Sequence, residues 1–399
     1  MRDLRGVWLL DPRFDFLLPW FCRECNISDD NVTLVGSYLG PSRRGRNTVT
    51  IGDTQQGHIF YLEPEEINRR YMARSGQDLP DAAAAFSGAY LPADPPFRTF
   101  LATGEIAVKA NHKGWQYDFF LRHGIPTPQT WSASDPASLR RLAAEKLDAH
   151  RRLVVKTPEL SGGYQMAVVT SAEETDRWLE QAQRESAAFL VSEYVPHTQS
   201  FSGMGLVTRE GAVHWICATE QVLYSDLSYE GMIYPPFAAP ETVGEIERLT
   251  CRIGEGLSAE GYFGFFNVDF IFGDAGLQAV EINARFGFGT LFYACACGAS
   301  FWAAVQGAQI GLDLPESRMI LGKIKGRHGR VYQNLKSESD SLLWYRSKTG
   351  RFQTFFSGTE APERFDGGSF IGLFGAFLDS AASRDAVLDE FWKSCLAWF

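Results

Sequence analysis

The sequence predicts a mixed α/β protein built from three successive units. Apolar runs of strand length alternate with amphipathic helical segments through most of the chain, which is the pattern of α/β and α+β domains. A Pro-rich segment at 91–100 separates the first unit from the second. We expect an N-terminal α/β unit over 1–108, a central unit over 109–311 and a C-terminal extension over 312–399.

In the first unit, apolar runs at 6–10, 32–40 and 57–63 predict strands, and 61–76 predicts a helix that ends near Gly76. The N-terminal apolar run is interrupted by Asp11, Arg13 and Asp15, which is unlike a signal peptide. We therefore expect the first run to be a buried strand, and the protein to be cytoplasmic.

The central unit contains the clearest helix and hairpin signals. Residues 112–124 carry apolar residues at helical spacing and are followed by Gly124, Pro126 and Pro128, which predicts a helix with a sharp end. Ser171 and Glu174 have the spacing of a capping box. The other expected elements are strands at 151–157, 165–170 and 189–195, a helix at 171–186, a hairpin at 204–221 turning at Glu210-Gly211, a helix at 241–261, two strands within 263–287 joined at 273–276, a strand-like run at 367–380 and a short C-terminal helix.

Composition excludes two broad classes of function. The chain has 399 residues, a net charge of -10 and no apolar run near the ~20 residues of a membrane span. A diffuse negative charge repels nucleic-acid phosphates, so we expect no DNA, RNA or membrane partner. The seven cysteines are scattered, which favours reduced thiols. Cys22 and Cys25 lack the second pair that a zinc site needs, so their role stays open, and Cys295 and Cys297 read as packing residues.

The strongest chemical signal lies in the strand pair at 263–287. Alternation places Asn267 and Asp269 on one face of the first strand, and Glu281, Asn283 and Arg285 on one face of the second. The other face, with Val268, Phe270, Ile271, Val280 and Ile282, suits a core. Two carboxylates beside an amide carbonyl are oxygen donors that Mg²⁺ accepts when it also binds phosphates, and an arginine nearby suits a phosphoryl oxygen. A solvent-facing hairpin is the alternative.

Two lysines precede this hairpin. Lys156 ends an apolar strand and is followed by Ser161, Gly162 and Gly163, a type of loop that binds phosphates through backbone N–H groups. Lys113 opens the helix at 112–124. Taken alone, each lysine is typical of a solvated surface cation. The prediction that the two lysines bind phosphates depends on their order and context in the chain. The Walker pattern G-x-x-x-x-G-K-[ST] is absent.

These segments together resemble the ATP-grasp superfamily, in that family's order, over about 111–290; the segment E-I-N-A-R at 281–285 is the most specific. The resemblance implies a two-lobed grasp fold with a lid-like part at about 150–197, and ATP and Mg²⁺ as cofactors. It also implies a reaction that turns a carboxylate into an acyl phosphate and joins it to an amine, forming a peptide or other amide bond in a biosynthetic pathway.

The resemblance also implies roles for individual residues. Lys113 and Lys156 would contact the phosphates of ATP, Ser161, Gly162 and Gly163 would close over them, and Glu193, Tyr194 and Val195 would bind the adenine end. Asp269, Glu281 and Asn283 would hold Mg²⁺. Arg285, with Lys156 and Asn267 as further catalytic candidates, would stabilise the transferring phosphoryl group.

Two positions depart from the family pattern. Where an acidic ribose ligand is usual the chain reads Pro-His-Thr-Gln, so Gln199 is the substitute candidate. D-alanine ligases place an arginine two positions before the first Mg²⁺ acid, where this chain has Asn267. The chain looks more like the peptide ligases of bacterial natural-product pathways, including the pheganomycin type.

The substrate end is less defined. The segment 220–237 reads as a mobile acidic and aromatic loop whose Glu220, Tyr229 and Glu230 would recognise an amine. A basic turn with Arg327 and Arg330 would hold a carboxylate; in both cases a plain surface loop is the alternative. Partners would be a small-molecule acid and amine, such as amino acids or peptides. Acyl transfer to a carrier-protein amine or thiol and an inactive nucleotide-binding regulator are alternatives. The substrates, the pathway, the part played by the N-terminal unit and the oligomeric state, with a homodimer as one candidate, stay open.

Overall fold

A computed structural model describes the protein over 101–158, 166–182, 188–225 and 227–285, over short segments on either side of these ranges, and over isolated residues between 290 and 304. On the N-terminal side these segments are five strands, and on the C-terminal side they are 312–314, 318–325, 343–346, 353–358, 370–378 and 383–389. The strand expected at 57–63, the helix expected at 61–76 and the pair Cys22 and Cys25 lie outside the described residues.

The N-terminal strands form a five-stranded sheet in the order β3-β2-β1-β4-β5. Its paired neighbours are all parallel, as expected of an α/β unit. The expected strands at 6–10 and 32–40 are confirmed as the first two of these elements. Their bounds are β1 (Val7–Leu10), β2 (Val32–Gly36), β3 (Thr48–Thr50), β4 (Ala82–Ala85) and β5 (Arg98–Thr99).

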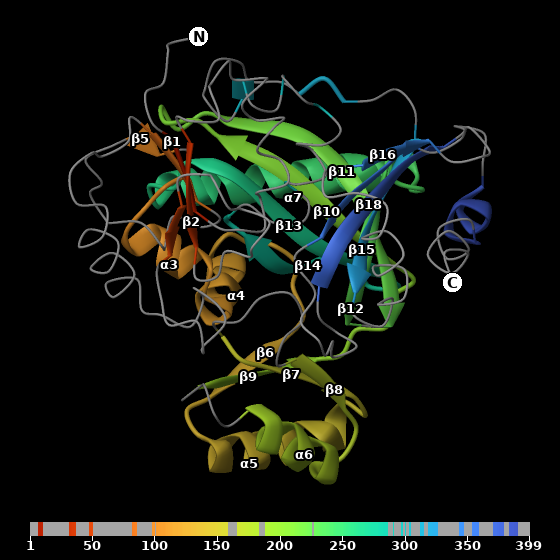
Figure 1. Ribbon diagram of the computed structural model, residues 1–399. Coiled ribbons are helices and arrows are strands. Elements are labelled where there is room, and N and C mark those ends of the chain that lie inside the picture. Colours follow the sequence, from red (N-terminus) through yellow and green to blue (C-terminus); the bar gives the residue numbers. More distant parts are fainter. Residues whose placement is uncertain are drawn as a thin grey trace.

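A nine-stranded sheet forms the body of the molecule, and the C-terminal extension belongs to it (Figure 1). The edge strand β14 carries two of the expected metal ligands, Glu281 and Asn283, and its neighbour β13 carries Asp269. In spatial order the strands are β14 (Gly276–Asn283), β13 (Gly264–Gly273), β10 (Gln199–Val207), β11 (Val213–Ser225), β12 (Ser228–Tyr234), β15 (Arg318–Lys325), β18 (Phe370–Leu378), β17 (Gln353–Gly358) and β16 (Leu343–Arg346).

The long helix α7 (Pro240–Ala259) packs directly on this sheet and buries Ile246, Leu249 and Ile253. The contact is close because β10 presents glycine to the helix. A Cβ placed on Gly203 would lie 2.2 Å from the hydroxyl oxygen of Thr250 and 3.0 Å from a methyl carbon of Ile246. The absent side chain therefore sets how near the helix axis approaches the strand.

A separate lobe stands below the body in Figure 1. It contains a four-stranded sheet in the order β6-β9-β7-β8, covered on the side away from the body by two helices. Leu153, Val155 and Val191 face those helices and form a core distinct from that of the body. The bounds are β6 (Thr130–Ala133), α5 (Pro136–Ala149), β7 (Leu153–Lys156), β8 (Met166–Val169), α6 (Ala172–Ala182) and β9 (Phe189–Glu193).

Two short helices, α3 (Glu105–Ala110) and α4 (Lys113–Arg122), lead from the N-terminal sheet to this lobe. The helix predicted at 112–124 is confirmed. Its N-cap is His112, whose ring accepts a hydrogen bond from the N–H of Trp115 at 3.2 Å, and Gly124 follows the helix at φ +57°.

Two local predictions were wrong. The segment 220–237 is mostly strand, since β11 and β12 are central members of the large sheet, and bulges near Leu223 and Tyr229 interrupt the alternation that would have revealed them. A bulge after Asp269 shifts the register, so that Ala279 rather than Val280 pairs with Phe270. Consequently Ala279 and Leu277 join the core, while Val280 and Ile271 are only half-buried.

At the start of α6, one of the two hydrogen bonds of the predicted capping box is present. The hydroxyl of Ser171 accepts a bond from the N–H of Glu174 at 3.3 Å, as a capping box requires. The carboxylate of Glu174, however, accepts from the N–H and hydroxyl of Thr170, at 2.7 and 2.9 Å, and so completes a cap one residue earlier than predicted.

Among the described residues, Cys217, Cys251 and Cys297 take part in no disulfide bond, and Cys297 is buried as expected. No helix in the described part of the chain is long and apolar enough to cross a membrane.

Candidate active site

The strands β13 and β14 pair as the alternation predicts. Asn267 lies opposite Asn283, and Asp269 lies opposite Glu281. The amide of Asn283 donates to one oxygen of Asp269 at 2.9 Å, so the polar face of the hairpin is a connected group rather than separate side chains. The bulge beyond Asp269 ends the regular ladder beside these residues, a place where bulges often re-aim side chains next to active sites.

The two carboxylates have opposite electrostatic surroundings. Burial and the neighbouring charge of Glu281 raise the pKa of Asp269 to about 7, against the lowering effects of Ser202, Asn283 and Arg285. Burial also raises the pKa of Glu281, but Lys113, Arg285 and Lys156 outweigh it, so the net shift of that pKa is downward. The pair therefore concentrates negative charge that a cation would stabilise.

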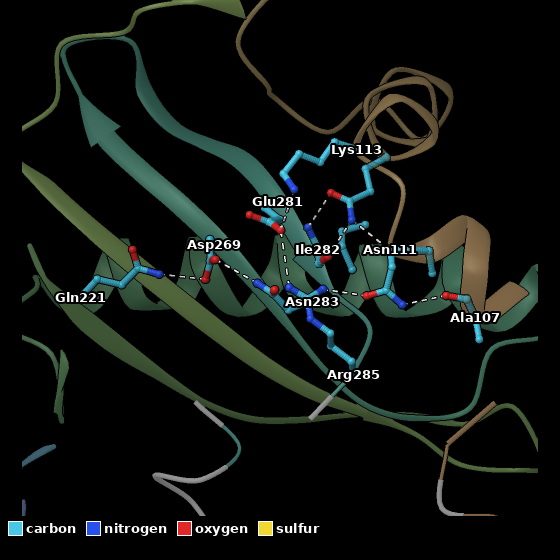
Figure 2. A network of polar contacts seen from close by, with 11 residues as sticks. Ala107, Asn111, Lys113, Gln221, Asp269, Glu281, Ile282, Asn283 and Arg285 are labelled. Atoms are coloured by element: carbon cyan, nitrogen blue, oxygen red, sulfur yellow. Dashed lines mark hydrogen bonds and ion pairs between the residues drawn. The ribbon is translucent and has the colours of Figure 1, made fainter. Parts of the chain in front are cut away.

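Three cationic side chains from different elements act on Glu281: Lys113 and Arg285, which Figure 2 shows beside it, and Lys156. Lys113, at the start of α4, places its ammonium nitrogen 3.5 Å from a Glu281 oxygen, and Arg285 places a guanidinium nitrogen 3.7 Å from the same oxygen. Burial, together with the charge of Lys113, lowers the pKa of Lys156 to about 8, while Glu281 opposes that shift. The lobe strand β7, helix α4 and the body hairpin thus contribute to one charged group.

Two polar side chains, Gln116 on α4 and Asn111 between α3 and α4, fix the edge of β14 and the residues that follow it. The buried amide of Gln116 donates to the carbonyl of Ile282 at 2.7 Å and accepts from its N–H at 3.1 Å, much as a neighbouring strand would. The Gln116 amide also donates to the carbonyl of Ala110 at 2.8 Å. Asn111 accepts from Arg285 at 2.7 Å (Figure 2). Both contacts stabilise the strand end that presents Glu281, Asn283 and Arg285.

The donor set fits Mg²⁺ in its chemistry. Asp269 and Glu281 supply carboxylate oxygens, and Asn267 has an amide oxygen that is buried without a hydrogen-bond partner among the described residues. An unpaired buried carbonyl is costly, and a hard cation accepts such oxygens. The described part of the chain contains no group of three or more His, Cys, Asp or Glu side chains suited to a metal, so a bound metal would draw further ligands from amides and substrate phosphates.

The residues expected at the adenine end lie around the connection between lobe and body. Glu193 pairs with Leu153 and Lys156 pairs with Leu190, so the two candidates lie three residues apart along β9, or about 10 Å. The Glu193 carboxylate accepts from the N–H of Gln129 at 2.9 Å, and the N–H of Tyr194 donates to the carbonyl of Arg152 at 3.3 Å. The carbonyl of Val195 contacts the ring of His197 at 2.9 Å.

Gln199 begins β10, and its side-chain amide donates to the carbonyl of Phe237 at 2.8 Å. Ser161, Gly162, Gly163, Arg327 and Arg330 lie outside the described residues.

The substrate candidates from 220–237 separate into two groups. Glu220 is 1% exposed, and its oxygens accept from Arg384 and from the N–H of Phe237, so it is engaged inside the protein. Tyr229 lies near Asp269, since burial and that charge raise the pKa of its phenol well above the usual range. Glu230 is 1% exposed and sits at the bulge in β12. Tyr229 is thus connected electrostatically to the hairpin through Asp269.

Sequence reasoning missed Gln221, whose amide donates to the second oxygen of Asp269 at 2.8 Å (Figure 2). Gln221 is the immediate neighbour of Glu220, and adjacent strand residues point to opposite faces. Recognising 220–225 as strand, with two-residue alternation, would have selected Gln221 in place of Glu220. Asn111 and Gln116 were missed because their partners are 174 and 166 residues away in the sequence.

Comparison with known proteins identifies this arrangement. Residues 110–289 match the family model of the ATP-grasp domain, and this segment is an ATP-grasp domain. The chain is 34% identical over 171 residues to the L-propargylglycine–L-glutamate ligase of Streptantibioticus cattleyicolor, a match that covers 41% of this chain and 31% of the relative. It is 26% identical over 186 residues to the [butirosin acyl-carrier protein]–L-glutamate ligase of Niallia circulans, covering 45% and 44%. Each match spans less than half of the relative's length.

Solved structures show the same fold over the whole chain. An ADP complex of N5-carboxyaminoimidazole ribonucleotide synthetase superposes with a TM-score of 0.72 at 13% identity, covering 100% of this chain and 98% of that one. The biotin carboxylase domain of Hydrogenobacter thermophilus 2-oxoglutarate carboxylase, solved with ADP, magnesium and bicarbonate, gives a TM-score of 0.72 at 14% identity, covering 100% and 90%. The predicted mixed α/β grasp architecture is confirmed.

Proposed function

We propose that this protein is an ATP- and Mg²⁺-dependent ligase that joins a carboxylate to an amine through an acyl phosphate and releases ADP. The observation that carries the proposal is the pairing of Asp269 with Glu281 at a point where Lys113, Lys156 and Arg285 converge from three elements. A site that combines paired acids with several cations suits a metal bound to a polyphosphate, because each charge then has a counter-charge.

In this proposal Asp269, Glu281 and Asn283 hold the metal, with the carbonyl of Asn267 as a further donor. When bound there, Mg²⁺ would neutralise charge on the phosphate oxygens. Lys113 and Lys156 bind the phosphates, and Ser161, Gly162 and Gly163 cover them. The segment from Glu193 to Val195, followed by Gln199, lies at the nucleoside end. We also propose Tyr229 and Glu230 as the nearest candidates for the substrate end.

The chemistry balances without a protein nucleophile. A carboxylate oxygen of the acid attacks the γ-phosphorus, the bond to the β-phosphate oxygen breaks, and ADP leaves. The amine nitrogen then attacks the acyl carbon, phosphate leaves with the former carboxylate oxygen, and the amine loses one proton. Arg285 stabilises the phosphoryl group as its charge develops, and the remaining groups position the reactants.

Glutamate is the first substrate to test. The names of both curated relatives include L-glutamate as one of the two joined partners. We propose that an amino acid or short peptide supplies the other group, and that the product is an amide within a biosynthetic pathway.

Trapping the activated acid tests the proposal. The protein is incubated with Mg·ATP, hydroxylamine and a pool of amino acids that includes glutamate. We expect an amino-acid hydroxamate and ADP in equal amounts, since hydroxylamine intercepts an acyl phosphate. Release of ADP that is independent of every acid tested, with no hydroxamate, would exclude acid activation.

Glu281→Gln tests the metal site in the same assay. We expect turnover to fall at least about 100-fold, because loss of a metal-binding carboxylate removes electrostatic stabilisation. Titration with Mn²⁺, followed by electron paramagnetic resonance, should show weaker binding. Glu255→Gln, on the exposed face of α7, makes the same chemical change away from the site and should behave as wild type. Wild-type turnover in Glu281→Gln would refute the metal assignment.

A second candidate is acyl transfer to a carrier protein, which the name of the Niallia circulans relative favours. An acylated carrier thiol is cleaved by alkaline hydroxylamine, whereas an amide is stable to it. Mass spectrometry of a carrier protein incubated with this protein, glutamate and Mg·ATP therefore distinguishes the two products.

A further inference from the structure

Asn111 lies between the end of α3 and the phosphate side of the candidate site. It follows the last residue of the helix, and its amide nitrogen donates to the carbonyl of Ala107 at 2.7 Å, which satisfies a carbonyl of the last helical turn. Its amide oxygen accepts from Arg285 at 2.7 Å (Figure 2). Both the amide nitrogen and the amide oxygen of Asn111 are therefore held in place, and the amide oxygen in turn holds Arg285.

Arg285 is only 7% exposed, so its orientation depends on the contacts that the protein provides. Two of its contacts in the described part of the site are with the neutral amide of Asn111 at 2.7 Å and with the more distant carboxylate of Glu281 at 3.7 Å. Glu281 is itself shared with Lys113 at 3.5 Å. Of these two contacts the shorter is with an uncharged acceptor, which directs the guanidinium group without cancelling its positive charge.

We propose that Asn111 is a positioning residue that aims Arg285 at the γ-phosphoryl group and preserves its charge for that group. The proposal deepens the proposed function and rests on it, because Arg285 acts on the γ-phosphoryl group only if the protein binds ATP here. An amide meets both requirements at once. Alanine at position 111 would remove the acceptor that orients Arg285. Aspartate would keep an acceptor, but its negative charge would neutralise the guanidinium group.

The experiment compares Asn111→Ala with Asn111→Asp. Both variants lose the donor to the Ala107 carbonyl, so any effect of loosening the end of α3 is common to the pair. The readout is the ratio of the Mg²⁺-dependent affinities for a non-hydrolysable ATP analogue and for ADP, measured by calorimetry. We expect this γ-phosphate discrimination to fall about fivefold in Asn111→Ala and further in Asn111→Asp, with the ADP affinity within twofold of wild type.

A double-mutant cycle with Arg285→Ala shows whether Asn111 acts through Arg285. We expect Asn111→Ala to change the discrimination less than twofold once Arg285 is absent. Equal effects in both backgrounds would overturn the proposal, because they would show a role in the fold alone. Wild-type discrimination in Asn111→Asp would also overturn it, since the neutral amide would then be unnecessary.

Lys109→Ala is the matched control on the same helix, since Lys109 is exposed and pairs with Glu105. It should leave the discrimination unchanged. Failure of the proposed function has a different signature. One outcome is that Asn111 and Arg285 control the discrimination between the analogue and ADP, but no acid gives a hydroxamate. In that case this inference stands and the proposed ligase reaction is excluded. A protein that binds neither nucleotide loses both.

Discussion

At the scale of single residues, charge and desolvation are concentrated in a few side chains of the hairpin and lobe. Lys156 is the clearest case, because it ends a short strand, is affected by Lys113 and Glu281, and has a pKa lowered to about 8. Burial and a neighbouring like charge both disfavour the ammonium form. An anionic ligand would reverse that preference, which links the protonation of Lys156 to nucleotide binding.

We therefore predict that nucleotide affinity depends on pH through Lys156. A bound phosphate raises the pKa of the lysine above its value of about 8 in the free protein, so binding takes up a proton above that pH. Affinity for ADP should be constant below pH 7 and fall by no more than about tenfold per unit above pH 8. Fluorescence titration of the tryptophans from pH 6 to 9.5 measures this.

Lys156→Arg is the control for this profile, because arginine keeps its charge over the whole range. Its ADP affinity should vary much less between pH 7 and 9.5 than that of the wild-type protein. A decline of the same size in both proteins would show that another group controls the pH dependence.

At the scale of elements, the edge of β14 is covered by the side chain of Gln116 and the carbonyl of Pro126 rather than by a further strand. Gln116 contacts both backbone groups of Ile282, and the carbonyl of Pro126 accepts from the N–H of Ala279 at 2.8 Å. Exposed strand edges are places of local opening and unwanted pairing. Here the covered edge also presents Glu281 and Arg285, so its order contributes to the geometry of the site.

Gln116→Leu should destabilise the fold by about 2–4 kcal/mol, because the backbone groups of Ile282 lose a buried partner. Urea unfolding measures the change in the free energy of unfolding. Leu121→Ala, at a site on the same helix that is 56% exposed, should change that free energy by no more than about 0.5 kcal/mol. Similar small effects in both variants would show that the edge contacts contribute little.

The close packing of α7 on β10 leads to a second prediction at the scale of elements. Gly203→Ala places a methyl group of β10 against Thr250 and Ile246, two residues of α7 that pack on this strand. We expect a loss of about 1–3 kcal/mol in the free energy of unfolding. Gly244→Ala is the control on α7, because a methyl group added there would have no other atom within 4 Å. It should leave the free energy of unfolding unchanged or raise it. A stable Gly203→Ala protein would contradict the close approach.

The sequence predicted the elements that depend on local patterns and missed contacts that depend on distant pairing. The β13–β14 hairpin follows from two-residue alternation and a Gly-Asp-Ala-Gly turn, and α4 follows from its apolar spacing and Gly124. The bulge after Asp269 was not visible, because a single extra residue leaves no compositional trace. Likewise, the roles of Asn111 and Gln116 appear only once β14 is brought beside them.

At the scale of the whole molecule, the C-terminal extension contacts the body through an ion pair whose carboxylate, that of Glu220, is buried. Arg384 donates to Glu220 on β11, and Glu220 in turn accepts from the N–H of Phe237 at 3.0 Å. Arg318 on β15 donates to the carbonyl of Pro235 at 3.3 Å and stacks on the ring of Phe237 at 3.6 Å. The carbonyl of Phe237 accepts from Gln199, so these contacts extend to the start of β10.

Arg384→Met should therefore destabilise the protein by about 3 kcal/mol, because it leaves the carboxylate of Glu220 buried without its charge partner. The double variant with Glu220→Gln should recover part of that loss. Thermal unfolding measures both, with the exposed Asp385→Asn as a neighbouring control. An Arg384→Met protein as stable as wild type would show that the extension is not anchored through this pair.

The proposed reaction forms ADP and needs both an acid and an amine. The most direct measurement is the quantitation of all nucleotide products after incubation with Mg·ATP and glutamate, with and without a second amino acid. We predict ADP, phosphate and amide product in equal amounts, only when both substrates and Mg²⁺ are present. Formation of AMP and pyrophosphate, or ADP release unaffected by either substrate, would contradict the account.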